Sequence, residues 1–319
     1  MVKFVITIPL PMNETELLSN LRASCQQVSH PPFFIVGSGR SGTTLVQTLL
    51  DSHPHIAIPP ESHIFYRFAE ILHCYRDLGQ PQNLTSLVRD ILNDKKIKPW
   101  GLNITPDEFC SLLEENSFRG ILSLLFGLYA SKHGKIRWGE KTPRHVLYLN
   151  EIKQVFPEAK IIHLVRDGRD VACSYYRVYF GPKRIDKIAE TWCQYLNAAD
   201  GFKRKSRPED FLEIKYEEIV EDPNRMIKTI CDFLGDSSFE VNGKVPDTPT
   251  KSFYLNKKEW HYSLNEAITK NKVGLFKSNL SRREIAIFES IAKDELSRHG
   301  YALLTSADAK ISWREQIGF

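Results

Sequence analysis

The sequence has few cysteines, and their spacing excludes two classes of protein. Its six cysteines include no C-x-x-C pair, so neither a structural zinc site nor a small disulfide-stabilised domain is expected. We expect reduced, buried thiols at these positions instead: Cys25, Cys74, Cys110, Cys173, Cys193 and Cys231.

Long hydrophobic runs are also absent. The longest candidate, GILSLLFGLYA at 120–130, is about half of the ~20 residues that a membrane span requires. The start, MVKFVITIPLPMNETE, is broken by two prolines and followed by acids, which is atypical of a secretory signal. We therefore predict a cytoplasmic protein with no membrane span.

A large excess of charge of either sign is missing as well. The 43 basic and 39 acidic residues leave a formal charge of +4, which gives no indication of a nucleic-acid partner. No repeat, low-complexity tract or long linker divides the 319 residues. The chain is predicted to be a single domain over 1–319, with its core at about 30–305.

What the sequence does contain is an alternation of strands and helices. Short apolar runs at 31–37 (PPFFIVG), 159–166 (AKIIHLVR) and 210–216 (DFLEIKY) are typical of buried parallel strands. Helices are expected at 13–27, in most of an insert at about 62–135, and from residue 170 onward. A further helix is expected over 185–199, with a core-facing side that includes Tyr195. Capping residues predict two more, one between Asp222 and Gly235 and one that begins at the capping box of Ser281. The predicted class is α/β, a P-loop-like parallel sheet flanked by helices on both faces.

The first predicted strand runs into a glycine-serine loop, GSGRSGTT at 37–44. Glycines 37, 39 and 42 allow backbone N–H groups to approach an anion, and a helix beginning near Ser41 adds partial positive charge. The side chains of four residues add further donors: Arg40, Ser41, Thr43 and Thr44. A nucleoside-triphosphate P-loop has lysine where Thr43 stands, so the loop suits one phosphate better than ATP hydrolysis.

A second cationic turn follows the second predicted strand, in LVRDGRDVACSYY at 164–176. Arg166 ends the strand, and Ser174 lies eight residues further on; an arginine with a serine hydroxyl forms a phosphate-sized donor set. Arg169 and Asp170 are expected to form a surface salt bridge or to start the helix. Because both turns follow strands of one parallel sheet, they predict a ligand with two separated phosphates.

These motifs resemble those of the sulfotransferases that use 3′-phosphoadenosine 5′-phosphosulfate (PAPS). The likeness rests on RSGTT at 40–44, Arg166 with Ser174, YEEIV at 216–220 and VGLFK at 273–277, and it is greatest for the branch with tyrosylprotein sulfotransferases and bacterial enzymes. It implies that the first loop, including Gly42, binds the 5′-phosphosulfate and that Arg166 and Ser174 bind the 3′-phosphate. The resemblance also implies that Tyr216 contacts the nucleotide, together with a C-terminal lysine, which is Lys272 or, as the alternative, Lys270. It further implies that the reaction requires no metal.

The resemblance also suggests the residues that carry the chemistry. Glu61, in HIAIPPESHIF, has the spacing of the catalytic glutamate; its apolar neighbours predict partial desolvation and a raised pKa. His63 is the alternative base. Lys141, in WGEKTPRH, matches the lysine that stabilises the transition state, unless Glu140 pairs with it at the surface. His145 is expected to orient a neighbour or to fill space.

The sequence therefore predicts transfer of a sulfuryl group from PAPS to a hydroxyl of a carbohydrate, phenol, small metabolite or peptide tyrosine. Val178 replaces an arginine of the tyrosylprotein branch, so tyrosine is not singled out; the acceptor pocket is expected from segments 62–135 and 240–265. An ATP-dependent phosphotransferase and a non-catalytic adenosine-nucleotide-binding protein are the alternatives. The joint presence of Glu61 and Lys141 favours the enzyme.

Overall fold

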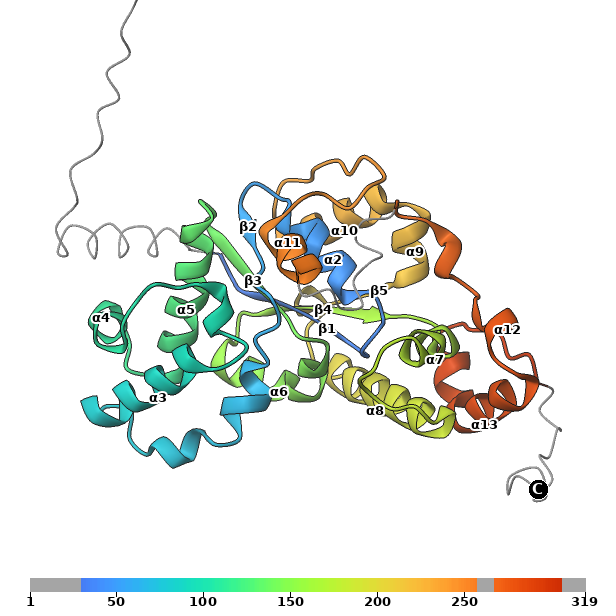
Figure 1. The fold of residues 1–319 in the computed structure, drawn as a ribbon, viewed down its shortest axis with the longest axis horizontal. Coiled ribbons are helices and arrows are strands. Elements are labelled where there is room, and N and C mark those ends of the chain that lie inside the picture. Colours follow the sequence, from blue (N-terminus) through green and yellow to red (C-terminus); the bar gives the residue numbers. More distant parts are fainter. Residues whose placement is uncertain (1–29, 257–266, 306–319) are drawn as a thin grey trace, which may run out of the picture.

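The computed structural model describes residues 30–256 and 267–305, which form an α/β fold around a parallel sheet (Figure 1). The helix predicted at 13–27 lies outside the described residues. The sheet has five strands in the order β2-β3-β1-β4-β5. Their bounds are β1 Phe33–Gly37, β2 Ile56–Ala57, β3 Arg137–Lys141, β4 Lys160–Val165 and β5 Phe211–Lys215.

The three strands expected from apolar runs are confirmed as β1, β4 and β5. β3 was not predicted because three of the five residues in RWGEK are charged. Arg137 is nevertheless fully buried in this strand, where its guanidinium donates to a carboxylate oxygen of Asp236 at 2.5 Å and to the carbonyl of Pro31 at 2.9 Å. A buried charge is tolerated when it is paired in this way, and the pairing becomes visible only in three dimensions.

Helices cover both faces of the sheet, as predicted (Figure 1). Residues alternate along β1, so Phe33 and Ile35 pack against one helical layer while Phe34 and Val36 pack against the other. The first layer contains α2 Thr43–Asp51, α9 Tyr216–Glu221, α10 Pro223–Leu234 and α11 Pro249–Asn256. Opposite it lie α5 Phe118–Lys132, α6 Leu149–Val155, α7 Gly168–Tyr176, α8 Ile185–Lys203 and α13 Arg282–Arg298.

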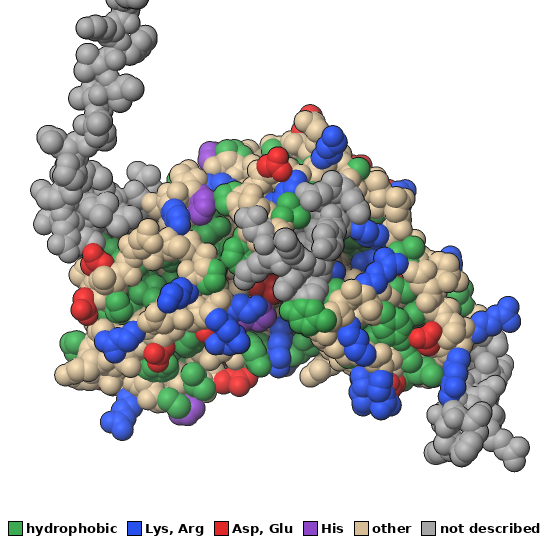
Figure 2. Space-filling view, in the orientation of Figure 1, with side chains coloured by type: hydrophobic (Ala, Val, Ile, Leu, Met, Phe, Trp, Pro, Cys, Tyr) green, Lys and Arg blue, Asp and Glu red, His purple; other side chains and the backbone are tan. Residues whose placement is uncertain are grey.

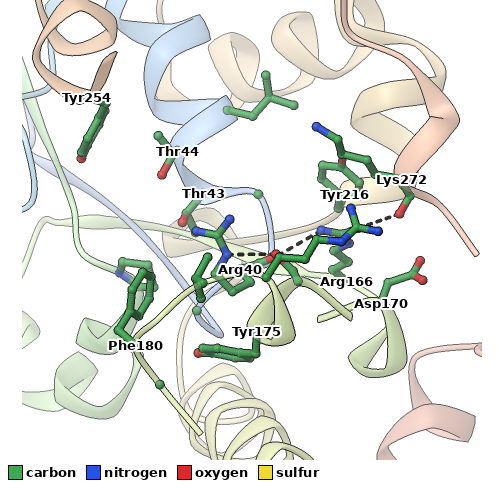
Figure 3. Close-up of a pocket in the computed structure, with 18 of the residues that line it drawn as sticks. Arg40, Thr43, Thr44, Arg166, Asp170, Tyr175, Phe180, Tyr216, Tyr254 and Lys272 are labelled. Carbon is green, nitrogen blue, oxygen red and sulfur yellow. Dashed lines mark hydrogen bonds between the residues drawn. The ribbon is translucent and has the colours of Figure 1, made fainter. Parts of the chain in front are cut away.

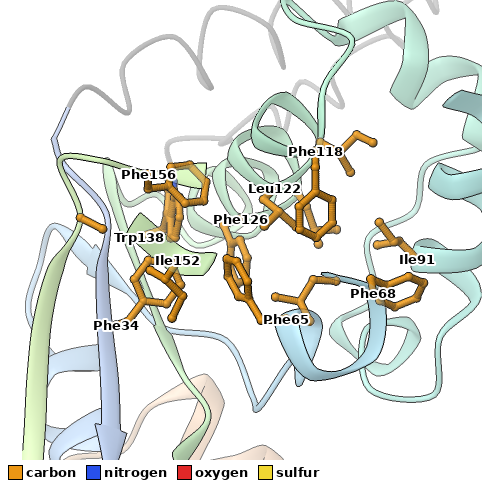
Figure 4. Packing of buried hydrophobic residues seen from close by; sticks show 14 of the residues in the cluster. Phe34, Phe65, Phe68, Ile91, Phe118, Leu122, Phe126, Trp138, Ile152 and Phe156 are labelled. Atoms are coloured by element: carbon orange, nitrogen blue, oxygen red, sulfur yellow. The ribbon is translucent and has the colours of Figure 1, made fainter. Parts of the chain in front are cut away.

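The segment 62–135 is helical in its regular elements, which are a π-helix at Phe65–Ala69, 3₁₀ turns at Leu72–Tyr75 and Lys98–Trp100, α3 Pro81–Asn93, α4 Pro106–Leu112 and α5. An aromatic cluster joins it to the sheet (Figure 4). Phe126 stacks on Trp138 of β3 at 4.7 Å between ring centroids, and Phe65 meets Phe34 of β1 edge-on at 5.9 Å. This packing fixes the chain next to Glu61 relative to the sheet.

The predicted helix ends are confirmed where their capping chemistry was explicit. Asp222 caps the N-terminus of α10 (Pro223–Leu234), and Gly235 follows its last residue in the left-handed conformation. Ser281 and Glu284 form the capping box of α13. Among the described residues, no helix is both long and apolar enough to cross a membrane. The five cysteines in this part of the chain are free thiols, and the prediction that they are buried is confirmed for Cys173 and Cys231. Cys110 and Cys193 are half-buried and Cys74 is exposed, while Cys25 lies outside the described residues.

Candidate active site

A cavity of about 1190 Å³ opens beyond the carboxyl ends of β1, β3 and β4 (Figure 3). Ligands of parallel α/β sheets usually bind at this edge. Segments far apart in the chain line the cavity, among them the β1–α2 loop, α7 with the loop that follows it, and the 3₁₀ turn Lys270–Lys272. Figure 2 shows several Lys and Arg side chains around the middle of the face it displays.

The β1–α2 loop is fixed by its own contacts and by aromatic neighbours. The helix begins at Thr43 rather than near Ser41, after Gly42 with a φ of 100°. A Cβ at Gly42 would lie 2.5 Å from the ring of Tyr216, so only glycine fits there. Ser41 is fully buried, and its hydroxyl donates to the carbonyl of Ser38 at 2.7 Å. Ser41 therefore braces the loop and does not present its side chain to the cavity.

The structure brings the two predicted cationic turns together. Arg40 Nε donates to the hydroxyl oxygen of Ser174 at 3.0 Å, and Arg166 Nη1 donates to the carbonyl of Arg40 at 3.2 Å (Figure 3). The guanidinium of Arg166 also lies 4.3 Å from the ring centroid of Tyr216. Two arginines, a serine hydroxyl and an aromatic ring thus meet in one cavity.

Asp170 and Arg169 are structural residues, so the predicted surface salt bridge between them is wrong. Asp170 is buried and accepts hydrogen bonds from the backbone N–H groups of Gly274 and Phe276, at 2.6 and 2.9 Å. Arg169 is buried between the carboxylates of Asp167 and Glu289. Both residues hold the C-terminal part of the chain against α7.

The two C-terminal lysines differ in position. Lys272 lines the cavity, and its carbonyl accepts a hydrogen bond from Arg166 Nη2 at 2.6 Å. Lys270 is exposed and pairs with Glu221 of α9 at 2.7 Å, outside the cavity lining. The alternative that assigned a phosphate contact to Lys270 therefore does not fit the structure.

Glu61, His63 and Lys141 meet on the other side of the β1–α2 loop. Lys141, at the end of β3, is fully buried; its ammonium pairs with the Glu61 carboxylate and lies 3.1 Å from Thr44 Oγ1. His63 Nε2 lies 3.1 Å from the second carboxylate oxygen of Glu61. One ammonium thus connects the β1–α2 loop with the candidate base.

Glu140 does not pair with Lys141 at the surface, so that alternative is wrong. Its buried carboxylate accepts hydrogen bonds from the hydroxyls of Ser62 and Thr142, both at 2.6 Å, and lies 2.8 Å from His145 Nδ1. Thr142 Oγ1 in turn accepts the backbone N–H of His63 at 3.2 Å. This network fastens the segment that carries Glu61 to the end of β3 that carries Lys141.

Comparison with known proteins places the chain in a family. A model described as "Sulfotransferase family" matches residues 31–240, a range that includes both arginine turns and all three candidate catalytic residues. The chain belongs to the sulfotransferase family.

Relatives of this sulfotransferase-family chain are distant. It is 23% identical over 265 residues to the omega-hydroxy-beta-dihydromenaquinone-9 sulfotransferase Stf3 of Mycobacterium bovis, an alignment covering 67% of the chain and 65% of that protein. A putative protein-tyrosine sulfotransferase of Caenorhabditis briggsae is 23% identical over 63% of the chain and 64% of its own length. The chain thus aligns with slightly less than two thirds of the length of these relatives.

A solved structure supports the fold assignment. The sulfotransferase domain from the curacin biosynthetic pathway superimposes with a TM-score of 0.62, at 20% identity, covering 86% of this chain and 99% of that domain. Relatives of both predicted kinds, bacterial enzymes and protein-tyrosine sulfotransferases, are therefore found, and the predicted family and α/β fold are confirmed.

The pKa of Glu61 differs from the expectation for a desolvated glutamate. Burial alone raises this pKa, but the Lys141 ammonium and the hydrogen bond from His63 outweigh it, so the pKa of Glu61 falls below its ordinary range. The predicted upward shift is wrong because Lys141, 80 residues away in sequence, is adjacent in space. In this sulfotransferase-family chain the candidate base is a paired carboxylate.

Several aromatic residues of the cavity were missed. Tyr254 of α11 accepts the backbone N–H of Glu61 at 3.4 Å, and its ring centroid lies 5.1 Å from Lys141 Nζ. Its distance of 193 positions from Glu61 left no signal in the sequence. Tyr195 of α8 packs against the core, as predicted, but it also lines the cavity. Among the described residues, no group of three His, Cys, Asp or Glu side chains could hold a metal ion.

Proposed function

We propose that this protein transfers a sulfuryl group from PAPS to a hydroxyl acceptor. The convergence of Arg40, Ser174 and Arg166 in one cavity supports this function most strongly. Two arginines and a serine hydroxyl that line one cavity provide the donors that a ligand with two phosphates needs. Thr43 and Thr44 line the same cavity at the start of α2, where backbone N–H groups and the helix dipole favour an anion.

In the proposed reaction, the acceptor oxygen attacks sulfur in line with the bond to the 5′-phosphate oxygen. The new S–O bond forms as the old one breaks, the acceptor proton passes to the Glu61 carboxylate, and the phosphate oxygen leaves with the electron pair. Lys141 is placed to stabilise charge on this oxygen, because its ammonium reaches Thr44 Oγ1 in the phosphosulfate loop. His63 remains the alternative base.

The variant Arg166→Ala tests the proposed 3′-phosphate contact separately from the other nucleotide contacts. We expect this variant to bind 3′-phosphoadenosine 5′-phosphate (PAP) at least about tenfold more weakly, because a charge-assisted contact is lost. Binding of 5′-AMP should change little. Calorimetric titration of both nucleotides measures the effect, and equal weakening of the two would contradict the assignment.

The pH dependence of kcat/KM distinguishes the two candidate bases. Because its pKa is lowered, Glu61 stays ionised below the ordinary glutamate value of about 4.3. With an aliphatic alcohol as acceptor, we therefore expect no acidic decline in kcat/KM between about pH 7 and pH 5. An acidic decline within this range would instead count against Glu61 and support His63 as the base.

Donor preference tests the proposal as a whole. We expect PAP to raise the thermal denaturation temperature more than ATP with magnesium does, since only ligand binding to the folded state stabilises it. Labelled PAPS should then transfer its sulfuryl group to an acceptor without added metal. Stabilisation by ATP with magnesium and labelling from ATP would support the phosphotransferase, and PAP binding without any transfer would support the non-catalytic alternative.

A further inference from the structure

In the part of the chain that the structure describes, basic residues outnumber acidic ones in the lining of the cavity. Six of its lining residues are Lys or Arg: Arg40, Lys96, Arg144, Arg166, Arg177 and Lys272. Among the lining residues that the structure describes, only Glu61 and Asp170 are acidic, and both already have partners within the protein. PAPS accounts for cations near the β1–α2 loop and α7. Arg144 belongs to neither, because it follows β3.

Arg144 is held in a geometry suited to an anion. Its guanidinium stacks on the ring of Tyr66, 3.9 Å from the centroid. No hydrogen bond or ion pair joins it to any other residue in the part of the chain that the structure describes, and its side chain is exposed. Stacking occupies the face of a guanidinium and leaves its N–H donors at the edge, the arrangement that grips a carboxylate or phosphate through two bonds.

Arg144 also lies close to the reacting groups. It follows Lys141 by three residues, and Tyr66 follows His63 by three, so each Cα is within about 11 Å of that of its catalytic neighbour. Thr142 joins these segments through its hydrogen bond with the backbone of His63. Burial raises the pKa of Tyr195, and the positive charge of Arg144 opposes this rise. The Arg144 guanidinium is therefore within electrostatic reach of Tyr195, which also lines the cavity.

The rim of the cavity is aromatic and fixed in place. Tyr179 and Phe180 follow α7 and are 72% and 39% exposed, with their rings edge to face at 5.8 Å. The Lys183 ammonium donates to the carbonyls of Tyr175 and Val178, which closes this loop. Exposed aromatic side chains beside a cavity favour a ligand with an apolar or aromatic body.

We propose that the acceptor is a small molecule with an apolar or aromatic body that carries an anionic group besides its hydroxyl, and that Arg144 binds this group. The inference rests on the proposed function, since it assigns the acceptor of that reaction. Arg144 then selects acceptors by charge: an acid gains two charge-assisted hydrogen bonds, while its uncharged analogue leaves the guanidinium without a partner.

Matched acid and amide pairs test this proposal by binding alone. Calorimetry compares 3-(4-hydroxyphenyl)propionate with its amide, and 12-hydroxydodecanoate with its amide, for the protein with and without saturating PAP. We expect at least one acid to bind about tenfold or more tightly than its amide. Arg144→Ala should abolish the difference and leave amide binding unchanged, while Arg144→Lys, which lacks the planar fork, should restore only part of it.

Arg204→Ala is the matched control, because this exposed arginine lies at the end of α8 outside the cavity lining. Equal binding of acid and amide, binding of neither acid, or a preference that survives in Arg144→Ala would overturn the proposal. A peptide with aspartate beside tyrosine forms a third arm, and tighter binding of that peptide would overturn the small-molecule assignment. Failure of PAP to bind would count against the sulfotransferase reaction. The titrations of the acids without nucleotide would still test whether Arg144 binds the anionic group.

Discussion

Glu61→Gln is expected to lower kcat by about 10²-fold or more, because loss of a general base usually costs a factor in this range. Glutamine keeps the size of the side chain and can still contact Lys141, but it cannot accept the acceptor's proton. PAP affinity should remain within about threefold of the unmodified protein, since Glu61 is assigned to proton transfer and not to nucleotide binding. Single-turnover kinetics with saturating PAPS measures the chemical step directly.

The control for this variant is Glu221→Gln, which removes a Glu–Lys pair at an exposed position next to Lys270. That pair lies outside the cavity lining, so kcat should not change. Glu61→Ala should behave like Glu61→Gln. Near-normal turnover in both Glu61 variants would exclude Glu61 as the base, and a comparable loss in His63→Ala alone would assign that role to His63.

Lys141→Met is expected to lower kcat by about 10²- to 10³-fold, the range seen when a donor to developing negative charge is removed. Methionine fills much of the volume of this fully buried side chain but carries no charge. The same change removes the main cause of the lowered pKa of Glu61, so that pKa should rise. The acidic decline of kcat/KM should therefore move to higher pH, a result that a purely structural role would not produce.

Two measurements guard against a trivial explanation of the Lys141→Met result. Circular dichroism during thermal unfolding shows whether the variant still folds, and Lys270→Met serves as a lysine control outside the cavity. A folded Lys141→Met protein with unchanged kcat would remove Lys141 from the proposed mechanism. Lost activity with an unmoved pH profile would mean that Lys141 does not control the ionisation of Glu61.

The sequence predicts the parts of this molecule whose signals are local. The apolar runs of β1, β4 and β5 and the caps at Asp222 and Ser281 lie within a few residues of the elements they define. The P-loop-like turn could be located for the same reason, and so could the arginine and serine after β4. Which of these motifs contact one another depends on the order of the strands in the sheet.

The features that sequence reasoning missed depend on long-range contacts. Arg137 is charged yet buried at the start of β3, because Asp236 and two carbonyls lie around it in the fold. The pKa of Glu61 was predicted in the wrong direction because only its apolar sequence neighbours were visible. Lys270 and Lys272 are two positions apart, and only the orientation of the 3₁₀ turn separates a surface ion pair from the cavity wall.

The hydrogen bonds that fix the Arg166 guanidinium have a thermodynamic consequence for nucleotide binding. Carbonyls from two remote segments already fix the side chain in its rotamer, and the ring of Tyr216 supports its face. The conformational entropy of this long side chain is therefore lost during folding and not at the moment of encounter. A bisphosphate would meet a rigid receptor at this end, so selectivity among adenosine nucleotides should depend on where their phosphates lie and hardly on how the protein adapts.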